Sequence, residues 1–183
     1  GYFVRVIDNL SGGHQKNLKH CLSDKKLKFK KYDICKLRYN DSFFKNVDYW
    51  IDACDSVKAK VSLASNLGKA SDNQRTFLVC GAAGGKVDPH KFICTDLGNA
   101  KNDALLSKVR YALRRHHDFP RSTVMKVSCI TSTELSKKVR TENSRISCSG
   151  YGSIVTVTAT MGLLAASEAI TQIINKKLFI KNF

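Results

Sequence analysis

The sequence lacks closely spaced cysteines. Its seven cysteines, at positions 21, 35, 54, 80, 94, 129 and 148, are never closer than fourteen residues. Structural zinc sites take their ligands from close pairs such as C-x-x-C, so a cysteine zinc site is not expected. The count is odd, and the opening residues show no signal-peptide pattern, so the sequence predicts a reduced, cytoplasmic protein.

Acidic residues are scarce relative to basic ones. Fifteen Asp and Glu stand against thirty-one Lys and Arg, which gives a net charge of +16. Residues 1–50 contain eleven basic and five acidic residues, and residues 51–183 contain twenty basic and ten acidic residues. The excess of positive charge is therefore spread along the chain and not confined to a terminal tail. Such a field favours a polyanionic partner such as RNA. A lysine-biased genome would give the same composition, and both interpretations stay open.

Long hydrophobic runs are also missing, with one exception at 154–170, IVTVTATMGLLAASEAI. This run is about the minimum length for a membrane span, but it contains three threonines, Ser167 and Glu168. It therefore favours a buried helix over a span.

The remaining pattern alternates short β-branched runs with helical runs. Strands are expected at 2–7, 27–32, 47–53, 76–80, 91–95 and 124–130, and helices at 14–22, 56–69, 103–117 and 151–175. This order predicts an α/β fold, with a Rossmann-like, mainly parallel sheet flanked by helices. The length fits a single domain over 1–183.

The first segment, residues 1–49, carries GYFVRVIDNLSGGHQKNL and FKKYDICKL. These runs resemble the nucleotide-binding half of the extended short-chain dehydrogenases, the NAD-dependent UDP-sugar epimerases and dehydratases. The resemblance implies that Asp8 and Asn9 hold the adenosine ribose of NAD and that Asp33 and Ile34 flank the adenine. That family's glycine-rich loop would precede Gly1, so the sheet is expected to be N-terminally truncated, without the loop and the first strand. The family's catalytic Y-x-x-x-K is absent.

The second segment, residues 50–183, contains four blocks: IDACDSVKAKVSLA, CGAAGGKVDPHKFICTDL, KVSCITSTE and SCSGYGSIVTVTATMGLLAASEAI. They resemble, in order, the tRNA threonylcarbamoyladenosine dehydratases, relatives of the ubiquitin-activating and molybdopterin-synthase-activating enzymes. The resemblance implies that ATP activates the carboxylate of a threonylcarbamoyl group on an anticodon-loop adenosine of tRNA, after which a ring closes. Because the two resemblances meet near Tyr49, the chain is predicted to be chimeric.

The D-x-x-D run supplies the candidate metal site. The resemblance implies that Asp55 holds the Mg²⁺ that bridges ATP phosphates, with Asp52 nearby. Magnesium prefers one or two carboxylates together with phosphate oxygens, which suits acids at a strand end. Asp55 as the N-cap of the following helix is the structural alternative.

Cys129, in KVSCITSTE, matches a family cysteine and is a candidate nucleophile toward an acyl-adenylate. That role needs a lowered thiol pKa, and an inert buried cysteine is the alternative. Cys148 matches a second family cysteine and is interpreted as structural.

Two further features concern phosphate binding. The loop GAAGG at 81–85 is not a Walker-type phosphate loop, so it indicates only close backbone approach. One helix end is basic and is either a solvated face or a phosphate contact: Arg110, Arg114, Arg115, His116 and His117. The sequence thus predicts an ATP- and Mg²⁺-dependent tRNA dehydratase, with a homodimer possible. An NAD-dependent epimerase fragment and a non-catalytic remnant are the alternatives.

Overall fold

The computed structural model describes residues 1–36, 43, 45–68, 76–122, 124–136 and 152–181, with side chains as far as Lys176. The chain divides into two compact units, Gly1–Asn46 and Val47–Phe183. The boundary lies close to the expected junction near Tyr49. The expectation of one domain over 1–183 stays a prediction.

The first unit is built on two parallel strands, β1 (Val4–Asp8) and β2 (Leu27–Lys31). They pair from Val4 opposite Leu27 to Asp8 opposite Lys31. Two 3-10 turns, η1 (Gln15–Leu18) and η2 (Ile34–Lys36), follow the strands. The helix expected at 14–22 is reduced to η1, because His14 provides no side-chain cap and the first turn has no acidic residue.

The second unit contains a four-stranded sheet in the order β3-β4-β6-β5. The strands β3 (Trp50–Asp52), β4 (Phe77–Cys80) and β6 (Ser128–Ser132) are parallel, and β5 (Phe92–Asp96) runs antiparallel to β6. Short 3-10 turns η4 (Pro89–Lys91) and η5 (Leu97–Asn99) flank β5. The predicted α/β fold with mainly parallel strands and flanking helices is confirmed.

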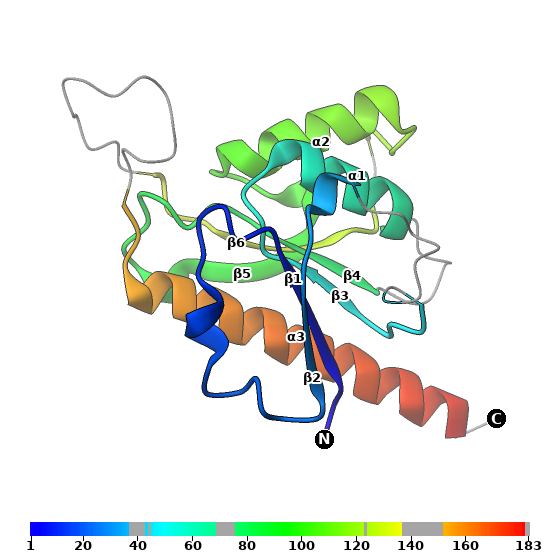
Figure 1. Cartoon of the computed structure of the whole chain (residues 1–183). Helices are drawn as coiled ribbons and strands as arrows, with labels where there is room; N and C mark the ends of the chain where they lie inside the picture. The colour runs from blue at the N-terminus through cyan, green and yellow to red at the C-terminus, as the bar shows by residue number, and fades with distance from the viewer. Residues whose placement is uncertain (37–42, 44, 69–75, 123, 137–151, 182–183) are drawn as a thin grey trace. The chain divides into compact units, whose positions relative to one another are not determined.

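Helices cover both faces of this sheet (Figure 1). On one face lie α1 (Val57–Leu67) and α2 (Ala104–His116), and on the other lies the long α3 (Val155–Lys181). The core cluster against α3 contains Leu78, Cys80, Phe92, Ile130, Val157, Met161 and Ala165. The second unit is therefore an α/β/α sandwich, and the carboxyl ends of its three parallel strands meet at one edge.

The strand expected at 124–130 begins later, at Ser128. Lys126 has a positive φ of 59°, which breaks an extended strand, and the backbone N–H of Met125 donates to Asp96 Oδ1 at 2.8 Å. Met125 and Val127 are buried all the same. Hydrophobicity alone therefore placed the start of this strand too early.

The long helix α3 buries one stripe of small and medium side chains, at Val157, Met161, Ala165 and Ala169. By length and composition, Val155–Lys176 could cross a membrane, with a mean hydropathy of 1.3. That signal is weak, because helices packed in protein cores pass the same test. The predicted buried helix is confirmed for this stripe only, since Val155 and Leu163 are largely exposed.

Candidate functional site

The D-x-x-D and GAAGG runs lie at the same edge of the second unit's sheet, where its parallel strands end. Asp52 is the last residue of β3, and the glycine-rich loop follows Cys80, the last residue of β4. The two strands are paired in parallel, with Asp52 opposite Val79. This edge is where α/β proteins bind their ligands.

Asp52 forms a buried ion pair with Lys60 of α1. Lys60 Nζ lies 3.2 Å from Asp52 Oδ1, and the two side chains are 0% and 1% exposed. The same Oδ1 accepts hydrogen bonds from the backbone N and the Sγ of Cys54, at 3.0 and 2.9 Å. Asp52 Oδ2 is buried without a hydrogen-bond partner among the described residues. The strand end therefore holds a fixed carboxylate with one oxygen unused.

Asp55 is exposed, three residues after Asp52. The N-cap of α1 is its neighbour Ser56, whose side chain accepts from the backbone N of Ala59 at 3.3 Å. The alternative role of Asp55 as helix cap is thus wrong, and its carboxylate is left to face solvent. Among the described residues, no group of three or more His, Cys, Asp or Glu could form a metal cage. A magnesium ion that takes its other ligands from phosphates and water needs no such cage.

The GAAGG loop is anchored by Asp103, the N-cap of α2. Asp103 Oδ1 accepts from Leu106 N at 2.9 Å, while its Oδ2 accepts from Ala82 N at 2.8 Å and Thr131 Oγ1 at 3.3 Å. Gly81 N donates to Ile130 O at 2.8 Å. Because these N–H groups are already used, this part of the loop does not serve as a phosphate cradle. This agrees with the expectation of close backbone approach alone.

Lys86 closes the other end of the loop from a buried position. Its Nζ donates to the backbone carbonyls of Asn102, at 2.9 Å, and of Glu134. Burial lowers the pKa of Lys86, and the charges of Asp103 and Glu134 oppose that shift. Glu134 Oε2 in turn accepts from the backbone N–H groups of Val87 and Asp88, at 2.9 and 3.0 Å. Lys86 and Glu134 together hold the segment after the loop against the end of β6.

Cys129 lies in β6, two strands away from Asp52, and is 0% exposed. Burial, with smaller contributions from Cys94 and Asp96, raises the pKa of the Cys129 thiol to about 12. Burial also raises the pKa of Cys54 to about 12 and of Cys80 to about 11. These thiols are protonated at neutral pH. The lowered pKa that a nucleophile needs is not found at Cys129, so its catalytic role stays a prediction.

The burial of these thiols predicts a pattern of chemical modification. At pH 8, a disulfide reagent should label the exposed Cys35 and Cys94 at least about a hundredfold faster than Cys80 and Cys129, because only an accessible thiolate attacks. Mass spectrometry of peptides from the native and urea-unfolded chain measures each position. Rapid native labelling of Cys129 would contradict the pattern and would favour its role as a nucleophile.

The residues expected at a nucleotide in the first unit lie together at one end of its two strands. Asp8 ends β1, and its backbone carbonyl accepts from Tyr32 N at 3.0 Å, just before Asp33. Asp8 Oδ1 and Asp33 Oδ1 each accept a local backbone N–H, from Leu10 at 2.6 Å and Cys35 at 2.9 Å. Asn9 makes a similar bond to Ser11 N at 2.9 Å, and Ile34 begins η2. Each polar side chain thus stabilises a turn, and a ligand role for Asp8, Asn9, Asp33 and Ile34 stays a prediction.

The burial of four charged residues was not predicted from the sequence: Lys60, Lys86, Asp96 and Asp103. The helical pattern predicted an apolar face at Val57, Val61, Ala64 and Leu67, but the buried positions of α1 are Ala59, Lys60, Leu63 and Ala64. A capping role for Asp103 was readable from its place before an amphipathic helix. Its bond to Ala82 joins residues far apart in sequence and had no sequence signal.

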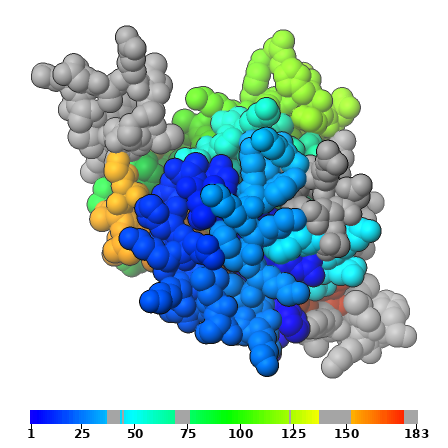
Figure 2. All heavy atoms as spheres, viewed as in Figure 1, coloured from blue at the N-terminus to red at the C-terminus, as the bar shows by residue number. Residues whose placement is uncertain are grey.

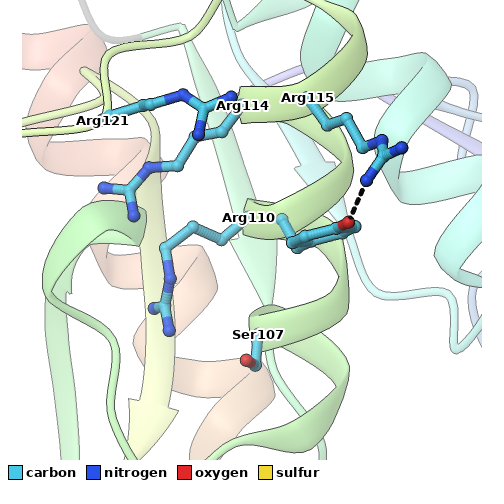
Figure 3. A pocket seen from close by; sticks show the side chains of 6 residues that line it. Ser107, Arg110, Arg114, Arg115 and Arg121 are labelled. Carbon is cyan, nitrogen blue, oxygen red and sulfur yellow. Dashed lines mark hydrogen bonds between the residues drawn. The ribbon is translucent and has the colours of Figure 1, made fainter.

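The basic end of α2 borders an open hollow of about 610 Å³ (Figure 3). It is lined by Ser107, Arg110, Tyr111, Arg114, Arg115 and Arg121. His116 is the last residue of α2 and His117 its C-cap, and neither lines the hollow. Arg121 was not among the predicted residues, because it follows the helix.

No family model matches the chain. The sequence is 32% identical over 146 residues to the tRNA threonylcarbamoyladenosine dehydratase of Haemophilus influenzae, covering 75% of this chain and 55% of the relative. It is 32% identical over 143 residues to the Escherichia coli enzyme of the same name, covering 70% and 52%. The chain therefore spans about half the length of the curated relatives it matches. These relatives support the dehydratase resemblance.

Solved structures agree on the fold. A crystal structure of E. coli tRNA N6-threonylcarbamoyladenosine dehydratase matches with a TM-score of 0.72 at 24% identity, over 89% of this chain and 62% of that one. The complexes of that enzyme with ATP and with AMP match with TM-scores of 0.70 and 0.71. The matched share exceeds the second unit, so the likeness includes part of the first. The epimerase resemblance is not shown by these comparisons, and NAD is not supported.

Proposed function

We propose that this chain is part of an ATP-dependent dehydratase that acts on threonylcarbamoyladenosine in tRNA. The proposal rests on relatives with that name at 32% identity. The observation that carries it in the structure is the buried Asp52 carboxylate, with its unpartnered Oδ2, three residues before the exposed Asp55. Both residues stand at the edge where parallel α/β sheets bind nucleotides.

The reaction class is inferred from the relatives. To close the ring, the carboxylate of the threonylcarbamoyl group must lose an oxygen atom, and ATP makes that oxygen a leaving group. The carboxylate of the threonylcarbamoyl group attacks the α-phosphorus of ATP, and pyrophosphate leaves. A nitrogen of the same group then attacks the activated carbonyl carbon, AMP leaves, and a ring closes in the anticodon-loop nucleoside. The net change in the tRNA is the loss of one water molecule.

Asp55 would hold Mg²⁺ in this proposal, and Asp52 Oδ2 is a second oxygen at the same strand end. The exposed Asp55 carboxylate fits the ion, because magnesium takes one or two carboxylates and its other ligands from phosphates and water; Asp52 Oδ2 is buried and would have to be uncovered to join it. When bound, the ion would neutralise charge on the departing pyrophosphate. Lys60 neutralises the other side of Asp52 and keeps its Oδ1 in place.

The buried, protonated thiol of Cys129 is not placed to attack an acyl-adenylate. Cys129 would have to become exposed, and its thiol pKa would have to fall, before it could attack an acyl-adenylate. We therefore assign the principal role to the carboxylates at the end of β3.

A cytoplasmic location and a homodimer fit a tRNA-modifying enzyme, and size measurement in solution would test the dimer.

ATP–pyrophosphate exchange in the presence of Mg²⁺ and tRNA that carries threonylcarbamoyladenosine tests the proposal. Asp55→Asn should lower the exchange rate about a hundredfold or more, because it removes charge that would hold the metal. Asp118→Asn is the matched control, since Asp118 is also an exposed aspartate of the second unit. Exchange at the wild-type rate in Asp55→Asn would reject the metal role. An inactive wild-type chain would reject the proposed reaction for this chain.

A further inference from the structure

We propose that the arginine-lined hollow on α2 is a docking site for the phosphate backbone of an RNA strand. The identification of that RNA as tRNA rests on the proposed function, whereas the site rests on the hollow itself. In Figure 3, Arg110, Arg114 and Arg121 lie on one side of the helix, and Arg115 extends from the other side. Figure 2 shows the light-green atoms of α2 at the molecular surface.

Two of the arginines are held in place by the protein. Arg110 NH1 donates to the carbonyls of Ala100 and Leu97, at 2.7 and 3.2 Å, and Arg114 Nε donates to Pro120 O at 2.9 Å. These bonds use only part of each guanidinium, whose fork of N–H donors matches phosphate oxygens. Because the side chains are ordered beforehand, less conformational entropy is lost on binding.

The charge around the hollow favours a polyanion. None of the described residues that line it is acidic, and α2 contains no Asp or Glu from Ala104 to His116. The nearest acids in sequence are Asp103, whose carboxylate is used by the GAAGG loop, and the exposed Asp118. The arginines are distributed over two turns of helix and the segment after it, which suits an extended strand better than one small anion.

Tyr111 adds a surface for an unpaired base. Tyr111 as a residue is 60% exposed, and the Arg115 guanidinium carbon lies 5.8 Å from the ring centroid. Arg115 NH1 also donates to the Tyr111 hydroxyl at 2.6 Å. Aromatic rings and arginine planes beside a basic groove are the usual means of binding single-stranded nucleic acid. The hollow therefore fits a loop or single strand of RNA.

Filter binding of the full chain to a tRNA transcript across a salt series tests the site. We compare Arg115→Gln/Arg121→Gln with Lys101→Gln/Lys108→Gln, which removes the same charge from exposed lysines that do not line the hollow. The arginine pair is expected to weaken binding about tenfold at 0.1 M salt and to reduce the log–log salt slope by about 1.5. The lysine pair should change either quantity much less.

The outcomes separate this site from the proposed reaction. Equal losses in the two double variants would overturn the site, because they would show binding by net charge alone. Absence of RNA binding by the wild-type chain would overturn it as well. The thermal unfolding temperature of each variant verifies that the fold is intact. Exchange measured with saturating tRNA reports the reaction independently, so either proposal can fail while the other stands.

Discussion

Lys60→Met is expected to lower the free energy of unfolding of the second unit by about 3–5 kcal/mol, the usual cost of removing one partner of a buried ion pair. The substitution retains most of the side-chain volume but removes the ammonium. The Asp52 carboxylate, with a side chain only 1% exposed, would then be buried without its countercharge. A loss of this size is a large part of the stability of a typical domain.

Urea unfolding followed by tryptophan fluorescence measures this effect, because the chain's only tryptophan, Trp50, lies in β3 beside Asp52. Lys58→Met is the matched control: Lys58 is exposed on the same helix, and its loss should change stability by less than about 1 kcal/mol. The double variant Asp52→Asn/Lys60→Met should recover much of the loss. Equal stability of Lys60→Met and Lys58→Met would show that the buried pair does not stabilise the fold.

Gly81→Ala is expected to destabilise the second unit by about 3 kcal/mol, through overpacking and a weakened charged hydrogen bond. A Cβ at this position would overlap Asp103 Oδ2 and would lie 3.1 Å from both Ile130 O and Leu106 Cδ1. The backbone oxygen cannot move without disturbing β6. Asp103 cannot move without losing its bonds to Ala82 and Leu106.

Gly162→Ala is the matched control for this substitution. Gly162 lies in α3, and nothing is within 4 Å of a Cβ added there. Alanine should be neutral at that position or stabilise the helix by up to about 1 kcal/mol. The same unfolding curves test both variants, and a Gly81→Ala chain as stable as wild type would contradict the close packing of the loop on Asp103.

The same measurements bear on the proposed function. Lys60 and Asp103 lie behind the carboxyl edge, so their substitution should act through the position of β3 and of the GAAGG loop. Asp55 is exposed, and its substitution should affect the reaction without a comparable loss of stability. Activity and unfolding measured on the same variants therefore distinguish residues that support the site from those that contact its ligand.

The sequence predicted the order and type of most elements. The alternation of β-branched and amphipathic runs was enough to expect a mainly parallel sheet, because parallel strands need a helix to cross between them. Strand β4 and helix α2 lie within a residue or two of their expected ranges. The D-x-x-D run was correctly placed at a strand end. The run before it is short and mainly apolar, and a helix follows it.

Other features followed only from tertiary contacts. The apolar pattern of α1 indicated a different buried stripe, because nothing in it predicts that a lysine is buried. Lys60 is buried because its ammonium pairs with the carboxylate of Asp52. The thiol of Cys129 is inaccessible to solvent because strands and helices pack on both sides of β6. The arginine hollow includes Arg121, which reaches it only because the chain turns after α2.

By itself the sequence determined the fold class, the family resemblance and the basic charge, since these depend on residue type and on spacing along the chain. The tertiary structure decided which charged groups are buried, which oxygen of Asp52 is unused, which N–H groups of the loop are occupied and which arginines share a hollow. The physical reason is that each of these depends on distances between residues far apart in the chain. Local patterns of hydrophobicity do not encode those distances.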